Sequence, residues 1–169
     1  MDKADSRAEL AKILLVGEMN PYGADPDHAL YCEPPHSAGG RLCRLVCQVH
    51  HRRYLAFRRV NLCESRWSMI AARKKAVEIR SWRDRPEVVV LLGKKVQEAF
   101  GFPAAWNQPF AIRLGNLVDP TYVLLPHPSG LCRVWNEPGA FEQARKFLGA
   151  AAPWVPWGET ANDARVSSP

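Results

Sequence analysis

Short apolar runs alternate along the chain with longer amphipathic stretches, a pattern typical of strands that are followed by helices. The most continuous runs are Val88-Val89-Val90-Leu91-Leu92 and Ile13-Leu14-Leu15-Val16. Apolar residues without alternation indicate strands that are buried on both faces, as in parallel sheets. We predict strands over residues 12–16, 54–63, 88–92, 110–114 and 122–125.

Helices are predicted between these strands, over residues 42–49, 67–82, 94–100 and 138–148. Ser65 is the expected cap of the second helix, and Pro138 is expected to open the last one. Strands that alternate with helices predict an α/β fold, a single domain of three α/β/α layers with a mostly parallel central sheet. We expect the domain to span residues 1–152 and residues 153–169 to form a loosely packed C-terminal tail.

Two of the predicted strands end in loops of unusual chemistry. Residues 13–16 are followed by Gly17-Glu18-Met19-Asn20-Pro21-Tyr22-Gly23. Residues 122–125 are followed by Pro126-His127-Pro128-Ser129-Gly130-Leu131-Cys132-Arg133. Ligands of parallel sheets bind at the carboxyl ends of strands, so the two loops are expected to share one cleft.

Composition and charge favour a nucleic-acid partner over a membrane. The 169 residues suffice for one domain with a core, and the formal net charge is +6, which suits DNA but also an ordinary basic protein. No acidic residue separates Glu33 from Glu64, whereas six arginines do: Arg41, Arg44, Arg52, Arg53, Arg58 and Arg59. Most of these side chains are expected simply to be solvated.

The remaining composition indicates a cytoplasmic monomer. Five cysteines occur without a Cys-x-x-Cys pair, so we expect reduced structural thiols and neither metal nor cofactor. No apolar stretch approaches the ~20 residues of a membrane span. The first residues lack the apolar core of a signal peptide.

The two loops together resemble the active-site motifs of the uracil-DNA glycosylase superfamily. Residues 17–21 are nearest to its Gly-Met-Asn-Pro motif, with Glu18 as an extra residue. In the second loop His127 stands where mismatch-specific members carry asparagine. The classical and single-strand-selective uracil glycosylases carry histidine at this position. Residues 88–102 and 122–134 are similar to segments of the mismatch-specific members, and the resemblance covers residues 12–150. It implies a uracil-DNA glycosylase-like fold and a monofunctional DNA glycosylase.

The resemblance also implies the two catalytic residues. When the bond from sugar to pyrimidine breaks, positive charge develops on the sugar and negative charge on the base. Asn20 would hold the attacking water, and His127 would donate a hydrogen bond to the pyrimidine O2. Without the resemblance, Asn20 caps a turn before Pro21 and His127 is satisfied by backbone.

Further residues would bind the base and the DNA. Asn61 would read the pyrimidine edge, and Tyr31 and His36 are alternatives for the aromatic that stacks on the flipped base. Leu131 would fill the duplex after flipping, although in isolation it reads as a core residue. The DNA backbone would be contacted by the neighbours of this leucine: Ser129, Gly130 and Arg133.

The sequence leaves the substrate base open. Tyr22 would crowd the pyrimidine C5 position and so favours uracil. The small residues Ser37-Ala38-Gly39-Gly40 would instead admit a bulky group, such as that of a glucosylated hydroxymethylcytosine in phage DNA, which suggests antiviral defence. A catalytically weak DNA-binding module is a third possibility, because the usual acidic water activator is absent.

Two other reaction classes are disfavoured. Lys94 and Lys95 follow Gly93 on a predicted helix, and nothing in the sequence places a lysine nucleophile in the cleft. We therefore expect hydrolysis without strand cleavage. A nucleotide-handling enzyme of another kind is disfavoured because the chain lacks a phosphate-binding Gly-x-x-x-x-Gly-Lys-Ser/Thr loop.

Overall fold

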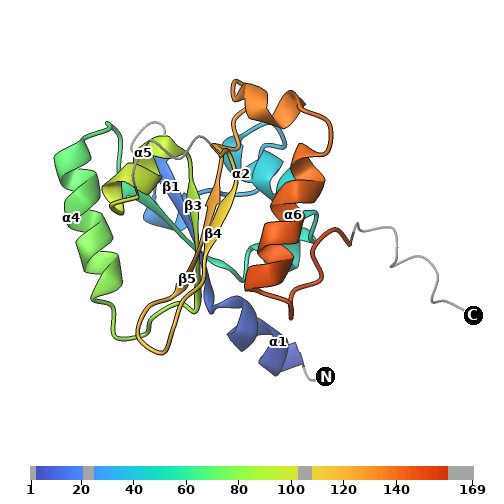
Figure 1. The fold of residues 1–169 in the computed structure, drawn as a ribbon, viewed down its shortest axis with the longest axis horizontal. Helices are drawn as coiled ribbons and strands as arrows, with labels where there is room; N and C mark the ends of the chain where they lie inside the picture. The colour runs from blue at the N-terminus through green and yellow to red at the C-terminus, as the bar shows by residue number, and fades with distance from the viewer. Residues whose placement is uncertain (1–2, 21–24, 103–107, 160–169) are drawn as a thin grey trace, which may run out of the picture.

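A computed structural model describes residues 3–20, 25–102 and 108–159 and shows one central sheet (Figure 1). The strands are β1 (Ile13–Met19), β2 (Arg58–Cys63), β3 (Val88–Leu92), β4 (Ala111–Arg113) and β5 (Thr121–Leu125). They are arranged in the order β2-β1-β3-β5-β4, and β4 alone runs antiparallel to its neighbour in the described sheet. The predicted α/β fold with a mostly parallel sheet is therefore confirmed.

Helices cover both faces of the sheet because successive side chains of each strand point to opposite faces (Figure 1). On one face, Leu15, Val90 and Val123 pack with the π-helix η3 (Leu42–Cys47) and with α6 (Ala140–Ala151). On the other face, Leu14, Val89 and Leu124 pack with α4 (Met69–Arg80) and α5 (Lys94–Ala99). Both faces are thus removed from water, as the continuous apolar runs require.

The strand predicted over residues 54–63 is wrong in its first half. Tyr54 ends the short helix α3 (His51–Tyr54), and β2 begins at Arg58. The Tyr54 side chain is fully buried, and its hydroxyl donates a hydrogen bond of 2.8 Å to the carbonyl of Leu30. A tertiary contact decides the conformation here, where the alternation of the sequence suggested a strand.

The start of α4 also differs from the prediction. Ser68, not Ser65, caps the helix, and its hydroxyl accepts a hydrogen bond of 3.3 Å from the N–H of Ala71. The helix faces the sheet with Ala72, Ala76 and Ile79, which are buried, while Ile70 is 85% exposed. Alanine lets the helix backbone approach the strands closely, so the large apolar residues alone do not mark the buried side.

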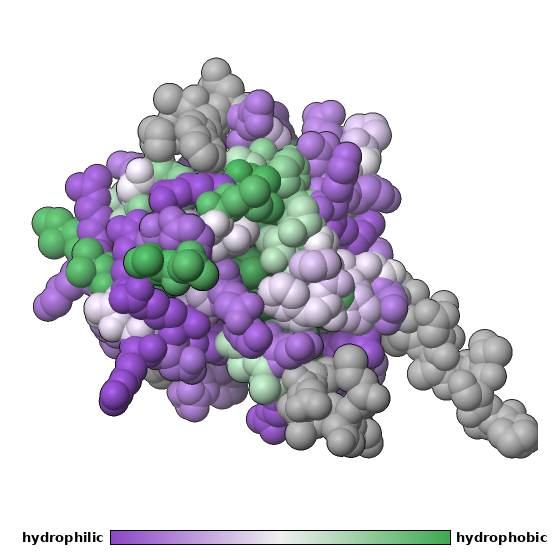
Figure 2. All heavy atoms as spheres, turned by 60° about the horizontal axis from the view of Figure 1, so that its bottom comes forward, coloured by the Kyte–Doolittle hydropathy of each residue, from purple (hydrophilic) through white to green (hydrophobic). Residues whose placement is uncertain are grey.

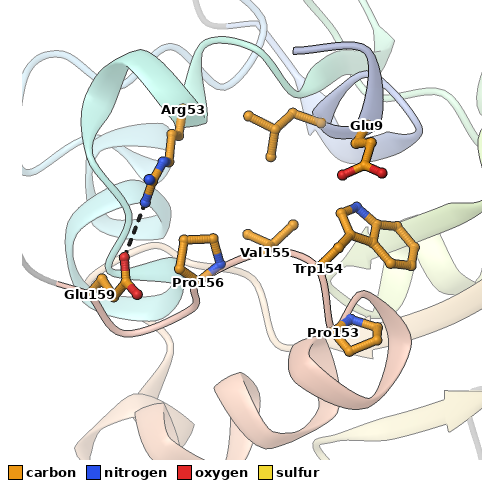
Figure 3. Close-up of a pocket in the computed structure, with 8 residues that line it drawn as sticks. Glu9, Arg53, Pro153, Trp154, Val155, Pro156 and Glu159 are labelled. Carbon is orange, nitrogen blue, oxygen red and sulfur yellow. Dashed lines mark hydrogen bonds and ion pairs between the residues drawn. The ribbon is translucent and has the colours of Figure 1, made fainter. Parts of the chain in front are cut away.

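The segment after α6 packs more closely than the predicted loose tail. Val155 is buried, the Trp157 ring lies 5.6 Å from that of Phe57, and the N–H of Gly158 donates to the carbonyl of Cys47. Residues 153–159 therefore belong to the folded domain, and residues 160–169 lie outside the described residues. Together with α1 (Lys3–Leu10), this segment frames a pocket of about 280 Å³, closed on one side by the Arg53–Glu159 ion pair (Figure 3).

The end of the sheet at which β5 begins has a mixed surface. Figure 2 shows apolar groups set among hydrophilic ones on this face. The β4–β5 turn contributes Leu114, Leu117 and Val118, all exposed. Within the described residues, no helix combines the length and the apolar character needed to cross a membrane.

Candidate active site

The predicted motif residues gather where the four parallel strands of the sheet end. We call this side of the sheet its carboxyl edge. Following the strand order, this edge presents Asn61 from β2, Asn20 after β1, Gly93 after β3 and His127 beyond β5. The strand β1 continues through Met19, further than the apolar run predicted, so that Asn20 directly follows the strand. Adjacent strands lie about 4.8 Å apart, which brings residues distant in sequence to one edge.

Asn20 and Asn61 are in direct contact. Asn20 is only 5% exposed, and its side-chain Oδ1 accepts a hydrogen bond from Nδ2 of Asn61. Asn61 lies opposite Gly17 in the β1–β2 register, and a Cβ at Gly17 would approach Asn61 Oδ1 to less than 3.0 Å. Gly17 is therefore the residue that lets the Asn61 amide lie across β1 and reach Asn20. That same oxygen of Asn61 is buried and has no hydrogen-bond partner among the described residues.

The loop that carries His127 is fixed by hydrogen bonds from three directions. The indole N–H of Trp135 donates to the His127 carbonyl at 2.8 Å, and Nε of Arg41 donates to the Pro128 carbonyl at 2.9 Å. The backbone N–H of Ser129 donates to Nδ1 of His127 at 3.2 Å. Because Nδ1 accepts, the neutral ring carries its proton on Nε2. The loop thus presents a defined N–H donor.

The electrostatic surroundings keep this imidazole neutral. Burial lowers the pKa of His127 below its usual value of 6.5, and this is the largest influence. The carboxylate of Glu18 raises the pKa and the ammonium of Lys95 lowers it, both to a smaller extent. Near neutral pH the ring is therefore an uncharged donor through Nε2.

Glu18 and Lys95 belong to this site, although neither was predicted as a site residue. The carboxylate of Glu18 lies 3.5 Å from Nζ of Lys95, and the Glu18 side chain is only 20% exposed. Nothing in the sequence placed Lys95 in the cleft, and this ion pair puts it at the edge of the site. The available signal was Glu18 itself, the extra residue in the first motif.

The rest of the His127 loop projects outward. Leu131 is 94% exposed, which excludes its interpretation as a core residue. Gly130 is exposed next to the guanidinium of Arg41, and Arg133 is exposed at the start of η4 (Arg133–Asn136). Ser129 is half-buried, and its backbone rather than its side chain contacts His127. Sequence reasoning counted Arg41 only among the basic residues and missed that it supports this loop.

The predicted base-stacking residues remain predictions. Tyr31 is 37% exposed and its ring meets that of His28 edge-on at 5.3 Å, while His36 is exposed. Tyr22 lies outside the described residues. None of these positions establishes which aromatic would stack on a base.

The small residues at positions 37–40 have a packing explanation. They begin α2 (Ala38–Arg41), which Ser37 caps. A Cβ at Gly39 would meet the backbone of Leu30 and Tyr31, and a Cβ at Gly40 would meet that of Pro34, each closer than 3.0 Å. Glycine is needed here for close backbone approach, so its small size does not indicate room for a bulky group on the base.

Much of the arginine-rich stretch is engaged within the protein. Arg44 pairs with Glu33, Arg53 with Glu159 at 3.2 Å, and Arg58 with Asp84 at 3.6 Å. These exposed pairs are worth little in stability, but they reduce the number of free cations. The stretch is therefore less available to DNA than its composition suggested.

No family model matches the chain, and no curated protein matches it. In the described parts of the chain, no group of three or more His, Cys, Asp or Glu residues is placed to hold a metal ion. The five cysteines are all free thiols, four of them buried.

Proposed function

We propose that this protein is a monofunctional DNA glycosylase that flips a pyrimidine out of DNA, hydrolyses its N-glycosidic bond and leaves an abasic site. One observation above all supports this: the N–H of Ser129 fixes the tautomer of His127, which leaves Nε2–H as a preorganised donor at the sheet edge that also holds Asn20. A rigid, uncharged donor in a partly buried site is suited to the negative charge of a departing pyrimidine.

On the base side, His127 would donate from Nε2 to the pyrimidine O2 as the bond between C1′ and N1 breaks. The electron pair of that bond moves onto the base, where the hydrogen bond strengthens as charge accumulates. The unpaired oxygen of Asn61 favours a ligand that brings a donor of its own, because buried acceptors are normally satisfied. Both the N3–H of uracil and the amino group of a cytosine can serve.

On the sugar side, water adds to C1′, and the proton that it releases balances the one taken up by the departing base. Asn20 is suited to orienting this water rather than deprotonating it, since an amide is a poor base. Its side-chain oxygen accepts a hydrogen bond from Nδ2 of Asn61. The pair would therefore act as a unit, with Asn61 fixing the amide of Asn20.

On the DNA side, Leu131 has the exposure that a wedge requires. A leucine that is 94% exposed on a loop held by Arg41 and Trp135 can enter the duplex without disturbing the core. Gly130 leaves the adjacent backbone open to a phosphate. A role as a wedge would thus account for the exposure of the apolar Leu131 side chain.

Uracil is the substrate that the proposal takes as its default. The small residues 37–40, which suggested room for a bulky modified pyrimidine, are explained by close backbone packing at Gly39 and Gly40. Glucosylated hydroxymethylcytosine remains the alternative substrate, and a DNA-binding module without catalysis remains the alternative function.

The decisive experiment incubates the protein with duplexes that contain uracil and with glucosylated phage DNA, and measures abasic sites by alkaline cleavage. We expect product from one of them, lost in both Asn20→Ala and His127→Ala. The exposed and distant Lys146→Ala serves as a matched control that retains activity. DNA binding without product from any substrate in the panel would reject the glycosylase and support the binding module.

A further inference from the structure

Glu18, from β1, and His127, from the loop after β5, flank the same glycine. A Cβ placed on Gly93 would lie 3.4 Å from Oε1 of Glu18 and 3.5 Å from Cδ2 of His127. Gly93 has a φ of +93°, a conformation that favours glycine, and it directly follows β3, which separates β1 from β5 in the sheet. The missing side chain thus leaves the carboxylate and the imidazole facing a shared space.

The orientation of the imidazole determines which ring edge meets that space. Nδ1 accepts the hydrogen bond from the Ser129 backbone. The His127 atoms nearest the built Cβ of Gly93 are its Cβ, at 3.2 Å, and Cδ2. The Cδ2 side of the ring therefore faces the glycine that Glu18 also flanks.

We propose that Glu18 is a positioning residue for His127: its carboxylate, which Lys95 holds in place, faces the imidazole across Gly93 and favours the protonated ring. This inference rests on the proposed glycosylase function and extends it to a residue outside the two motif positions. Lys95 contributes by its ion pair at 3.5 Å and by the Trp67 ring, whose centroid lies 5.6 Å from Nζ.

The arrangement has a chemical consequence for the substrate. A carboxylate near the imidazole stabilises the imidazolium, which can pass a proton to the leaving base and return to the neutral ring, whereas Lys95 opposes this. Donation matters most for a base that departs as a strongly basic anion. A cytosine derivative, which lacks the second carbonyl of uracil, leaves as the more basic anion. Glu18 beside His127 therefore makes cytosine-type substrates chemically accessible. Removing the Glu18 carboxylate should slow the excision of cytosine-type bases more than the excision of uracil.

The first arm of the test needs no substrate. Histidine ring NMR titrations follow the pKa of His127 in the whole protein, with the resonance assigned by its loss in His127→Gln. The charges that face this ring are Glu18 from β1 and Lys95 from the first turn of α5. Glu18→Gln should lower the His127 pKa further, and Lys95→Met should raise it. Lys94→Met, on the same turn and exposed, is the matched control and should leave it unchanged.

Opposite shifts of the His127 pKa in Glu18→Gln and Lys95→Met cannot arise from misfolding. A damaged fold would expose the ring in both variants and shift its pKa in the same direction. The proposal is overturned if Glu18→Gln leaves the His127 pKa where it is in the unmodified protein. Melting curves of the unmodified protein and of the four variants confirm that the comparison is made on folded chains.

The second arm measures single-turnover excision on the substrate found active. We expect Glu18→Gln to slow the chemical step about tenfold, with DNA affinity unchanged and the acidic limb of the pH profile displaced. Shifted titrations with no excision on any substrate would reject the glycosylase and keep the Glu18–His127 coupling. Normal excision with unshifted titrations would keep the glycosylase and reject the coupling.

Discussion

Gly17 makes room for Asn61. The two residues face each other in the β1–β2 register, and the side chain of Asn61 crosses the glycine to donate a hydrogen bond to Asn20. A polar pair at the end of a buried strand therefore depends on one residue without a side chain. The consequence can be tested by adding a single methyl group.

Gly17→Ala should displace the Asn61 amide and weaken both fold and activity. Overpacking of this kind costs about 1–3 kcal/mol in the free energy of unfolding. Urea denaturation measures that loss, and single-turnover excision should fall at least about tenfold as Asn20 loses its partner. Gly149→Ala, in the helix α6, is the control. A Cβ there would lie 3.9 Å from Trp157, which is an ordinary contact distance. Equal stability of the two variants would contradict the steric role of Gly17.

Leu131→Ala should separate stability from function. The side chain is 94% exposed, so the free energy of unfolding should change by less than about 0.5 kcal/mol. If Leu131 fills the gap left by a flipped base, excision from duplex DNA should fall about tenfold or more, while excision from single strands changes little. The ratio of the two rates measures this directly. An equal loss on both substrates would remove Leu131 from the role of wedge.

Tyr54→Phe should destabilise residues 29–32, the segment whose Leu30 carbonyl accepts the hydrogen bond of Tyr54. The hydroxyl of Tyr54 is buried and donates to the Leu30 carbonyl, so its removal leaves a buried acceptor unpaired. We expect a loss of about 1–3 kcal/mol, measured by urea denaturation. Hydrogen exchange should accelerate around residues 29–32 more than in β3. Unchanged exchange in this segment would show that the hydrogen bond does not hold it.

His127 should make stability fall as the solution is acidified. Burial lowers its pKa in the folded state below 6.5, so the unfolded chain binds the proton more readily. The stabilising contribution is complete above pH 6.5 and is lost as pH falls from that value toward the folded pKa. His50 behaves in the same direction, because burial and the neighbouring charges lower its pKa too. The measurement is therefore the difference between the unmodified protein and His127→Gln, which should shrink on acidification.

The sequence predicted well where local pattern and tertiary environment agree. The run 88–92 is a strand buried on both faces, and the two polar loops do follow strands of one sheet, β1 and β5, with β3 between them. It failed where the environment overrides the local signal. Tyr54 looks like a strand residue but is fixed in a helix by its hydroxyl, and Ser65 lies only three residues before the serine that caps α4.

The candidate site was predictable in its motif residues and not in its supporting ones. Asn20, Asn61 and His127 could be chosen by residue type. Glu18 was recognisable only as an extra residue in the first motif, and its place at the site depends on β1 continuing past the apolar run. Gly93 and Arg41 act through space, on residues far away in the sequence. Such partners follow from strand order, which a pattern of apolar residues does not specify.

The site residues are so far apart in the sequence that no short continuous fragment contains the site. Asn20 and His127 come from opposite ends of the sequence, and the exposed turn around Leu117 lies between the strands that precede His127. A chain severed in that turn should yield two inert pieces whose catalytic competence returns only when they reassociate. Recovered turnover would then report reassembly of the sheet, which makes this turn the natural place to divide the protein into a complementation pair.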